Sequence, residues 1–279
     1  MSDRRRWALP TSDSWLRWAA RFGYAACGIM YIAIGFAAGS VALGFARHPK
    51  GSEDVMVSMA RQPFGELVVI ALGVGLAGYA ALNFAGAIND PEDRGVSLYG
   101  LAIRAADALT GALYIALAVA ALGIVVTPDT NSMNTAVRWA AKILELPFGS
   151  VILALIGSTL MVSGAYLLYR AWTEPFGNML DRRSISGDTR KAVRIAARAG
   201  TAVRAVIFGI CGFFVLRAAA SQTPERIGDV ADALAALGRG TFGPVLLGIA
   251  AAGFVAYGAY QLTKARYQRI APAGGVSGQ

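Results

Sequence analysis

Two ionisable residues lie in apolar stretches of the sequence: Asp107 in the run 105–128 and Arg204 in the run 195–216, which also carries Arg198. A charge at membrane depth is costly unless it has a partner or reaches a surface, so such residues are candidates for function. Asp107 and Arg204 could pair across an interface between two parts of the chain. Alternatively, Arg204 extends to the nearest aqueous surface and Asp107 pairs with Arg104, one helical turn away. The sequence leaves both interpretations open.

No catalytic or cofactor-binding motif accompanies these charges. The only histidine, His48, provides too few ligands for a histidine-based metal or haem site. The sequence has no P-loop, dinucleotide fingerprint, Gly-x-Ser-x-Gly or paired-cysteine motif. Cys27 and Cys211 lie in apolar runs, where we expect buried thiols and no disulfide. We therefore expect no catalytic site, no metal and no cofactor.

Polar residues also occur along the apolar runs. They could line a polar path or form hydrogen bonds between helices, and we favour the second interpretation. They are Tyr31, Tyr79, Asn83, Tyr114, Tyr166, Tyr257, Tyr260 and Gln261.

The composition indicates that the elements positioning these residues lie in a membrane. The chain is 56% hydrophobic and only 15% charged, whereas soluble domains carry about a quarter charged residues. Six apolar runs each exceed the ~20 residues that a helix needs to cross a bilayer. They predict six transmembrane helices at 22–46, 67–89, 105–128, 146–169, 195–216 and 240–263.

The distribution of Lys and Arg predicts the orientation. The N-terminus, the segments around 90–104 and 170–204 and the C-terminus hold eighteen of these residues, and the opposite loops hold eight. The positive-inside rule then places both termini in the cytoplasm, in a multi-pass protein of the bacterial inner membrane. The net charge of +9 also favours contact with anionic lipid headgroups. No basic domain with interleaved aromatic residues is present, so we expect no nucleic-acid partner.

A sequence pattern recurs three times along the chain. Each copy has Arg, a small residue seven positions later and an aromatic residue three beyond that: Arg21/Gly28/Tyr31, Arg104/Gly111/Tyr114 and Arg198/Ala205/Phe208. The repeat predicts three units of two spans, at 15–95, 96–185 and 186–270. A cytoplasmic tail at 1–14 and a disordered tail at 271–279 flank them. The fold class is therefore an all-α bundle of three pseudo-threefold repeats.

A second motif marks the outer start of the second helix in each unit. It reads Pro63-Phe64-Gly65, Pro147-Phe148-Gly149 and Thr241-Phe242-Gly243. Pro disfavours helix in the residue before it, and Gly permits a sharp turn. The Phe falls at headgroup level, where aromatic rings are favoured. Before each motif, an amphipathic stretch at 53–60, 134–144 or 226–237 predicts a short helix on the outer face, either in the interface or as a packed cap.

The repeat also aligns three arginines, Arg21, Arg104 and Arg198. Around a pseudo-threefold axis they would ring the cytoplasmic mouth of the bundle. There they would either contact an anion or lipid headgroup or serve only as anchors that fix the topology.

Together the two motifs, in this order and spacing, resemble the bacterial domain of unknown function 1206 family over about 15–270. The resemblance implies a membrane protein of three tandem two-helix units and brings no activity with it. The family's first motif usually carries Arg before the small residue. Here only Arg204 does so, and Cys27 and Thr110 occupy the other two positions.

Two functional classes remain. A structural or accessory membrane subunit is favoured, because the chain has few charges at depth, no midplane acidic cluster and no span broken by Pro. The alternative is a channel or transporter that binds a small solute or lipid at the axis between the repeats. An enzyme is disfavoured, and a protein partner or homo-oligomer stays open. A hollow, polar axis would favour the alternative, and a packed, dry axis would favour the subunit.

Overall fold

A computed structural model describes residues 14–89, 98–126, 135–173 and 187–267. The tails predicted at 1–14 and 271–279 lie outside the described residues, apart from Ser14. The elements in order are α1 (Ser14–Ala42), α2 (Ser52–Ala60), α3 (Gly65–Asn89), α4 (Leu98–Val126), α5 (Thr135–Leu144), α6 (Gly149–Thr173), α7 (Gly187–Ser221), the 3-10 helix η1 (Pro224–Arg226), α8 (Val230–Leu237) and α9 (Gly243–Tyr267).

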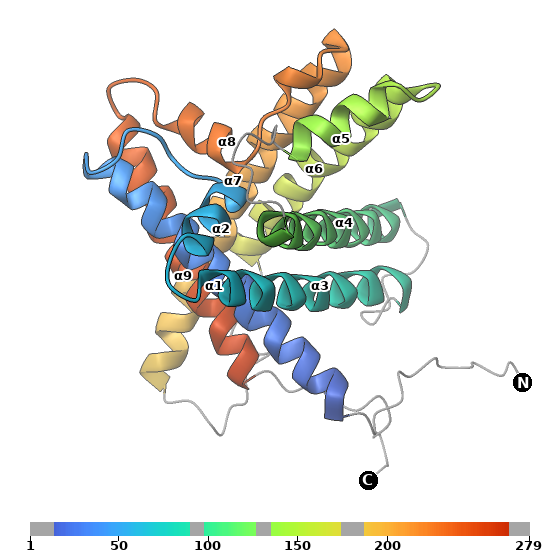
Figure 1. Cartoon of the computed structure of the whole chain (residues 1–279). Coiled ribbons are helices and arrows are strands. Elements are labelled where there is room, and N and C mark those ends of the chain that lie inside the picture. The colour runs from blue at the N-terminus through green and yellow to red at the C-terminus, as the bar shows by residue number, and fades with distance from the viewer. Residues whose placement is uncertain (1–13, 90–97, 127–134, 174–186, 268–279) are drawn as a thin grey trace, which may run out of the picture.

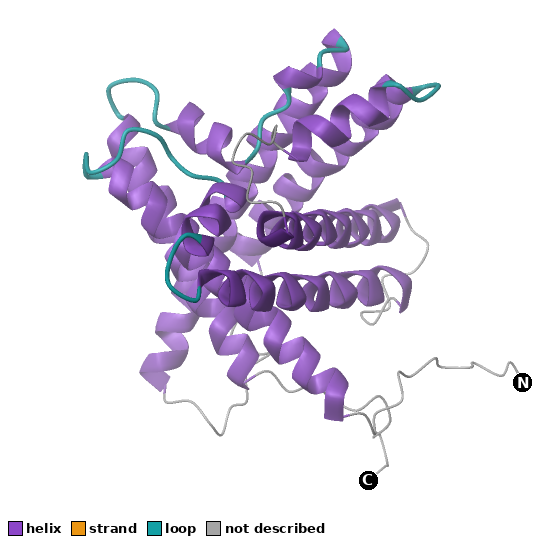
Figure 2. Ribbon diagram, viewed as in Figure 1, coloured by secondary structure: helices purple, strands orange, loops and turns teal. Residues whose placement is uncertain are grey.

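The predicted all-α membrane fold is confirmed. The described part of the chain has six helices long and apolar enough to cross a membrane, and they are α1, α3, α4, α6, α7 and α9. Every regular element in the described residues is helical (Figure 2). A continuous apolar surface around most of each long helix suits lipid on the outside and other helices on the inside. The chain is therefore a multi-pass membrane protein.

The long helices pack in pairs that join neighbouring units. The second helix of each unit makes its most extensive contact with the first helix of the next: α3 with α4, α6 with α7, and α9 with α1. The α9–α1 pair brings the two ends of the described chain together and closes the ring (Figure 1). Contacts within units 1 and 3 are also substantial, but those between α4 and α6 in unit 2 are few.

The two ends of the bundle differ. We call the end with α2, α5 and α8 the short-helix side. The opposite end, where α1, α4 and α7 begin and α3, α6 and α9 end, is the terminal side. These names describe the fold only, and the cytoplasmic assignment of the terminal side stays a prediction.

The repeated Phe-Gly motif forms the turn into α3, α6 and α9. A Cβ on Gly65, Gly149 or Gly243 would overlap a carbonyl oxygen at the end of the preceding short helix. In the first two units, Phe64 and Phe148 adopt left-handed backbone conformations with φ of 60° and 63°. The three Phe side chains are 75–81% exposed. The motif thus combines a turn that excludes a Cβ with a ring directed away from the bundle.

The short helices pack unequally. Met56 of α2 and Leu234 of α8 are fully buried in the main core, so these two helices are packed caps. In α5 the only buried residue is Ala140, while Trp139 is 53% exposed. The second short helix therefore lies at the margin of the bundle, and the three units are not equivalent on the short-helix side.

The cap of α8 leads to a pH prediction. Asp229 is its N-cap: the carboxylate accepts from the Asp232 N–H at 3.1 Å, and the Asp232 carboxylate accepts from the Asp229 N–H at 3.1 Å. Burial raises the pKa of the Asp229 carboxyl above its usual value, and the nearby Asp232 and Asp54 charges act in the same direction. Compared with the unfolded chain, folding thus shifts the Asp229 carboxyl toward its protonated form.

We expect Asp229→Asn to stabilise the protein at neutral pH, because Asn caps helices as well as Asp does and carries no buried charge. The contribution of Asp229 to stability is greatest below the ordinary pKa of 3.8 and is lost as pH rises through the raised folded pKa. Thermal unfolding in detergent from acidic to neutral pH measures this difference. A constant difference between variant and wild type at all pH values would contradict it.

Candidate functional site

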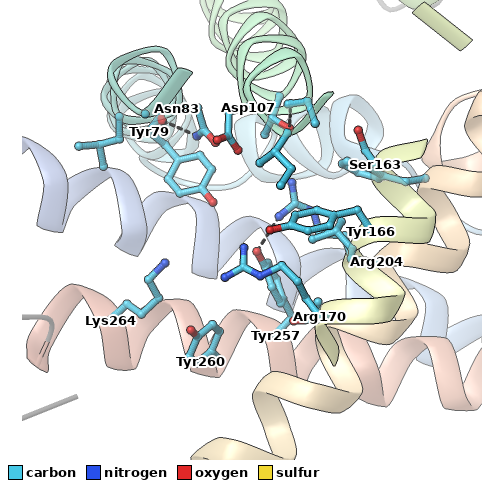
Figure 3. Close-up of a pocket in the computed structure, with 18 of the residues that line it drawn as sticks. Tyr79, Asn83, Asp107, Ser163, Tyr166, Arg170, Arg204, Tyr257, Tyr260 and Lys264 are labelled. Atoms are coloured by element: carbon cyan, nitrogen blue, oxygen red, sulfur yellow. Dashed lines mark hydrogen bonds between the residues drawn. The ribbon is translucent and has the colours of Figure 1, made fainter. Parts of the chain in front are cut away.

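A polar cavity of about 290 Å³ lies on the terminal side between all six long helices (Figure 3). Its lining is unusual for a bundle in lipid because it includes four ionisable side chains. Arg170 of α6, Arg204 of α7 and Lys264 of α9 contribute positive charges, and Asp107 of α4 contributes a carboxylate. Tyr24 of α1 and Asn83 of α3 complete the contributions from the six helices.

The repeat explains how six helices converge on one cavity with different side chains. Equivalent positions of the three units line it, and the residue type changes from unit to unit. The equivalent sets are Tyr24/Asp107/Thr201, Tyr79/Ser163/Tyr257, Leu82/Tyr166/Tyr260 and Gly86/Arg170/Lys264. A pseudo-threefold framework thus carries an asymmetric, mainly cationic lining.

Arg204 is the most deeply placed of these charges, with 6% of its surface exposed. Its Nη1 donates to the hydroxyl of Tyr257 at 2.6 Å. The guanidinium carbon lies 4.7 Å from the ring centroid of Phe208, 5.4 Å from that of Tyr257 and 5.9 Å from that of Tyr31. These distances permit cation–π attraction. Its Nε is buried and has no hydrogen-bond partner in the described structure.

Next to Arg204, a network of polar side chains joins four helices. Tyr114 of α4 donates to the hydroxyl of Tyr31 of α1 at 3.1 Å, and its oxygen lies 3.4 Å from the Cys27 sulfur. Gln261 of α9 donates to the hydroxyl of Tyr79 of α3 at 3.1 Å. Tyr31, Tyr79, Tyr114 and Gln261 therefore make the expected bonds between helices. The cavity lining also includes five of the eight polar residues, as the interpretation as a polar path requires: Tyr79, Asn83, Tyr166, Tyr257 and Tyr260.

The other two cations lie nearer the helix ends. The Lys264 ammonium is 4.2 Å from the ring centroid of Tyr24 and 5.7 Å from that of Tyr260. The guanidinium carbon of Arg170 is 5.7 Å from the ring centroid of Tyr166. Aromatic rings thus lie beside both cations. The charged ends of Arg170 and Lys264 are directed toward the cavity (Figure 3).

Asp107 and Arg204 come from different units and line the same cavity. The Nη1 atom of Arg204 donates to the Tyr257 hydroxyl. Asp107 lies beside Asn83 (Figure 3). The Asn83 side-chain amide donates to the Tyr79 carbonyl at 2.7 Å. The ion pair between Asp107 and Arg204 stays a prediction.

Comparison with known proteins now places the chain. The family model described as Domain of Unknown Function (DUF1206) matches residues 22–90, 108–174 and 199–268, one match in each unit. The chain belongs to the DUF1206 family. It is 29% identical over 256 residues to the uncharacterized protein YxxB of Bacillus subtilis (strain 168), with 92% of each chain covered. No solved structure matches the chain.

Two of the aligned arginines of this DUF1206 protein bind helix ends. Arg104 donates from Nε to the Ala87 carbonyl at 2.7 Å and from Nη2 to the Ile88 carbonyl at 3.3 Å. Arg198 makes the equivalent bonds, at 2.9 Å to Ala171 and 2.6 Å to Trp172. Each therefore satisfies terminal carbonyls of the helix packed beside it.

The third aligned arginine is Arg21, and its guanidinium carbon lies 6.0 Å from the ring centroid of Trp18. The cavity of the DUF1206 protein is lined instead by Arg170 and Lys264, which sequence reasoning counted only as topology charges. A signal was present in the repeat: both residues lie 21 positions after the turn glycine, at the position of Gly86 in unit 1. Comparing residue types at equivalent positions would have shown two cations replacing a glycine.

Proposed function

We propose that this membrane protein binds a small anionic group of the phosphate type in the cavity on its terminal side. The observation that carries the proposal is the convergence of Arg170, Arg204 and Lys264 on one cavity, in which Asp107 is the single carboxylate among the described residues. Excess buried positive charge is unfavourable unless an anion offsets it. Guanidinium and ammonium groups are also the side chains that bind phosphate oxygens most strongly.

The geometry favours binding over conduction. Toward the short-helix side the centre is filled by apolar side chains, among them Met30, Ile34, Leu76 and Phe254, each no more than 2% exposed. The caps α2 and α8 add Met56 and Leu234 to the same cluster. A cavity open on one side and blocked on the other suits a binding site. With the orientation that the Lys and Arg bias favours, this site faces the cytoplasm.

The apolar packing on the short-helix side supports a structural subunit, the function that the sequence favoured. The polar cavity on the terminal side argues against that function. The charges at depth are few, but two of them, Asp107 and Arg204, meet Arg170 and Lys264 in one cavity. The buried Nε of Arg204 has no hydrogen-bond partner in the described residues. A purely structural bundle does not require three cations in one cavity, whereas a binding site for an anion does.

The replacement Lys264→Gln tests the proposal. Wild-type protein in an uncharged detergent should unfold at a higher temperature as inorganic phosphate or glycerol phosphate is added, because a ligand that binds the folded state stabilises it. Because Lys264→Gln loses one charged contact, it should need about tenfold more phosphate than wild type for the same rise in unfolding temperature. Lys191→Gln is the matched control, because it removes an equal charge from an exposed position on α7 outside the cavity.

Sodium chloride at matched ionic strength separates specific binding from screening. If neither phosphate compound stabilises the wild type more than chloride does, the protein has no such site. Equal phosphate responses of Lys264→Gln and Lys191→Gln would place any binding outside the cavity.

A further inference from the structure

A second, apolar groove adjoins the polar cavity. It has a volume of about 330 Å³ and lies between α4 and α6, lined by Ile103, Ala106, Val162, Ala165, Tyr166 and Tyr169, with Ser163. Four of these residues, Ile103, Ala106, Ser163 and Tyr166, also line the cavity. The cavity and the groove therefore adjoin, and these four residues form a wall that both share.

The groove exists because α4 and α6 do not approach as closely as the corresponding helices of units 1 and 3. In those units, Gly23 and Gly200 pack against the backbone of the neighbouring helix. A Cβ on Gly23 would lie 2.8 Å from the Tyr79 nitrogen, and a Cβ on Gly200 would lie 2.6 Å from the Tyr257 nitrogen. The equivalent residue of unit 2 is Ala106, which lines the groove.

The second helix of each unit shows the same difference between unit 2 and the other two units. Gly75 and Gly253 are the equivalent residues of α3 and α9, and a Cβ on either would overlap a side chain of the helix that it faces. Unit 2 has Thr159 at this position. Close approach therefore needs glycine on both helices. Unit 2 lacks both glycines, and its two helices make the fewest contacts of the three pairs.

The groove is open to the surroundings of the bundle, which are lipid. Val162 is 53% exposed and Tyr169 is 60% exposed, and both lie on its α6 wall. A soluble anion would gain nothing from an apolar channel that opens sideways into a bilayer. An amphiphile would use both compartments at once.

We propose that the bound anion is the headgroup of an anionic lipid, which enters sideways between α4 and α6. Its phosphate lies among Arg170, Arg204 and Lys264, and one acyl chain lies in the groove along Val162 and Ala165. The proposal rests on the proposed function, since it names the source of the anion. Charge complementarity selects an anionic headgroup, and the apolar groove selects a lipid over free phosphate.

The experiment fills the groove. Ala165→Trp places a large ring in it, and Ala259→Trp is the matched control, at the equivalent exposed position of α9 outside the groove. Both variants are reconstituted in nanodiscs of phosphatidylcholine with a minor fraction of phosphatidylglycerol. Native mass spectrometry then measures how much phosphatidylglycerol each protein retains after release into detergent.

We expect wild type and Ala259→Trp to retain phosphatidylglycerol over phosphatidylcholine. Ala165→Trp should retain it about tenfold less, because about two methylenes lose their burial. Lys264→Gln should lose retention by a similar factor. Inorganic phosphate should stabilise Ala165→Trp as it does wild type, since the headgroup compartment is unchanged. Val162→Trp repeats the groove test if Ala165→Trp does not fold.

The outcomes separate the two proposals. Undiminished retention in Ala165→Trp and Val162→Trp, with a normal phosphate response, overturns the lipid and leaves a site for a soluble anion. Retention that Lys264→Gln does not reduce indicates lipid on the outer surface only and overturns the lipid proposal. Absence of any phosphate response in wild type overturns the proposed function itself.

Discussion

Replacing Gly243 by Ala is expected to lower the free energy of unfolding by about 3 kcal/mol or more, among the largest effects of any single methyl group in this protein. The added Cβ would overlap the carbonyl oxygen of Gly238, at the end of α8. Because that contact is with backbone, no side-chain rotation relieves it. The turn must open, which pulls α9 away from the cap α8 and disturbs the packing of its buried residue Leu234.

Gly248→Ala is the control. It lies in the same helix, and a Cβ there meets nothing within 4 Å, so replacing glycine should be neutral or stabilise by up to about 1 kcal/mol. Thermal unfolding of both variants in the same detergent measures the difference. Equal stability of the two variants would mean that the turn tolerates a Cβ. Gly65 and Gly149 face the same type of carbonyl, so the expectation extends to all three units.

The sequence predicted the features that depend on local patterns. Apolar runs longer than a bilayer define the six spans, and the Phe-Gly motif marks where α3, α6 and α9 begin. The ends are less well predicted where charges occur inside a helix. α7 runs from Gly187 to Ser221, whereas its apolar run starts only at residue 195, because Arg and Lys in its first turns hide the helix from a hydropathy argument.

Features that depend on contacts between distant segments were not predictable in this way. The predicted pseudo-threefold axis implies a closed ring, yet no local pattern indicates that the most extensive contact is the one between α1 and α9. Close approach depends on a small residue meeting a small residue across the interface, as Gly28 does beside the Gly258 carbonyl. The convergence of Arg170 and Lys264 needs that ring to be known first. Their charges look like topology signals until α6 and α9 are placed around one cavity.

Arg204→Met is expected to weaken phosphate binding by about a hundredfold while leaving the protein as stable as wild type or more so. The charge is buried, and its Nε has no hydrogen-bond partner in the described residues. A buried charge without a full set of partners is unfavourable, so an apolar side chain of similar size removes that cost. Met also packs well against aromatic rings, here those of Tyr31 and Phe208. The Tyr257 hydroxyl loses its partner, which costs about 1 kcal/mol.

Opposite changes in binding and stability are typical of a residue retained for function. Phosphate titration and thermal unfolding of the same preparation measure both quantities, and Arg204→Lys is the second variant. Lysine keeps the charge but lacks the planar fork, so it should recover part of the binding. If Arg204 serves only to hold the bundle together, Arg204→Met will instead lose stability and keep its phosphate response. That result would make Arg204 a structural residue of the bundle and would leave phosphate binding to Arg170 and Lys264.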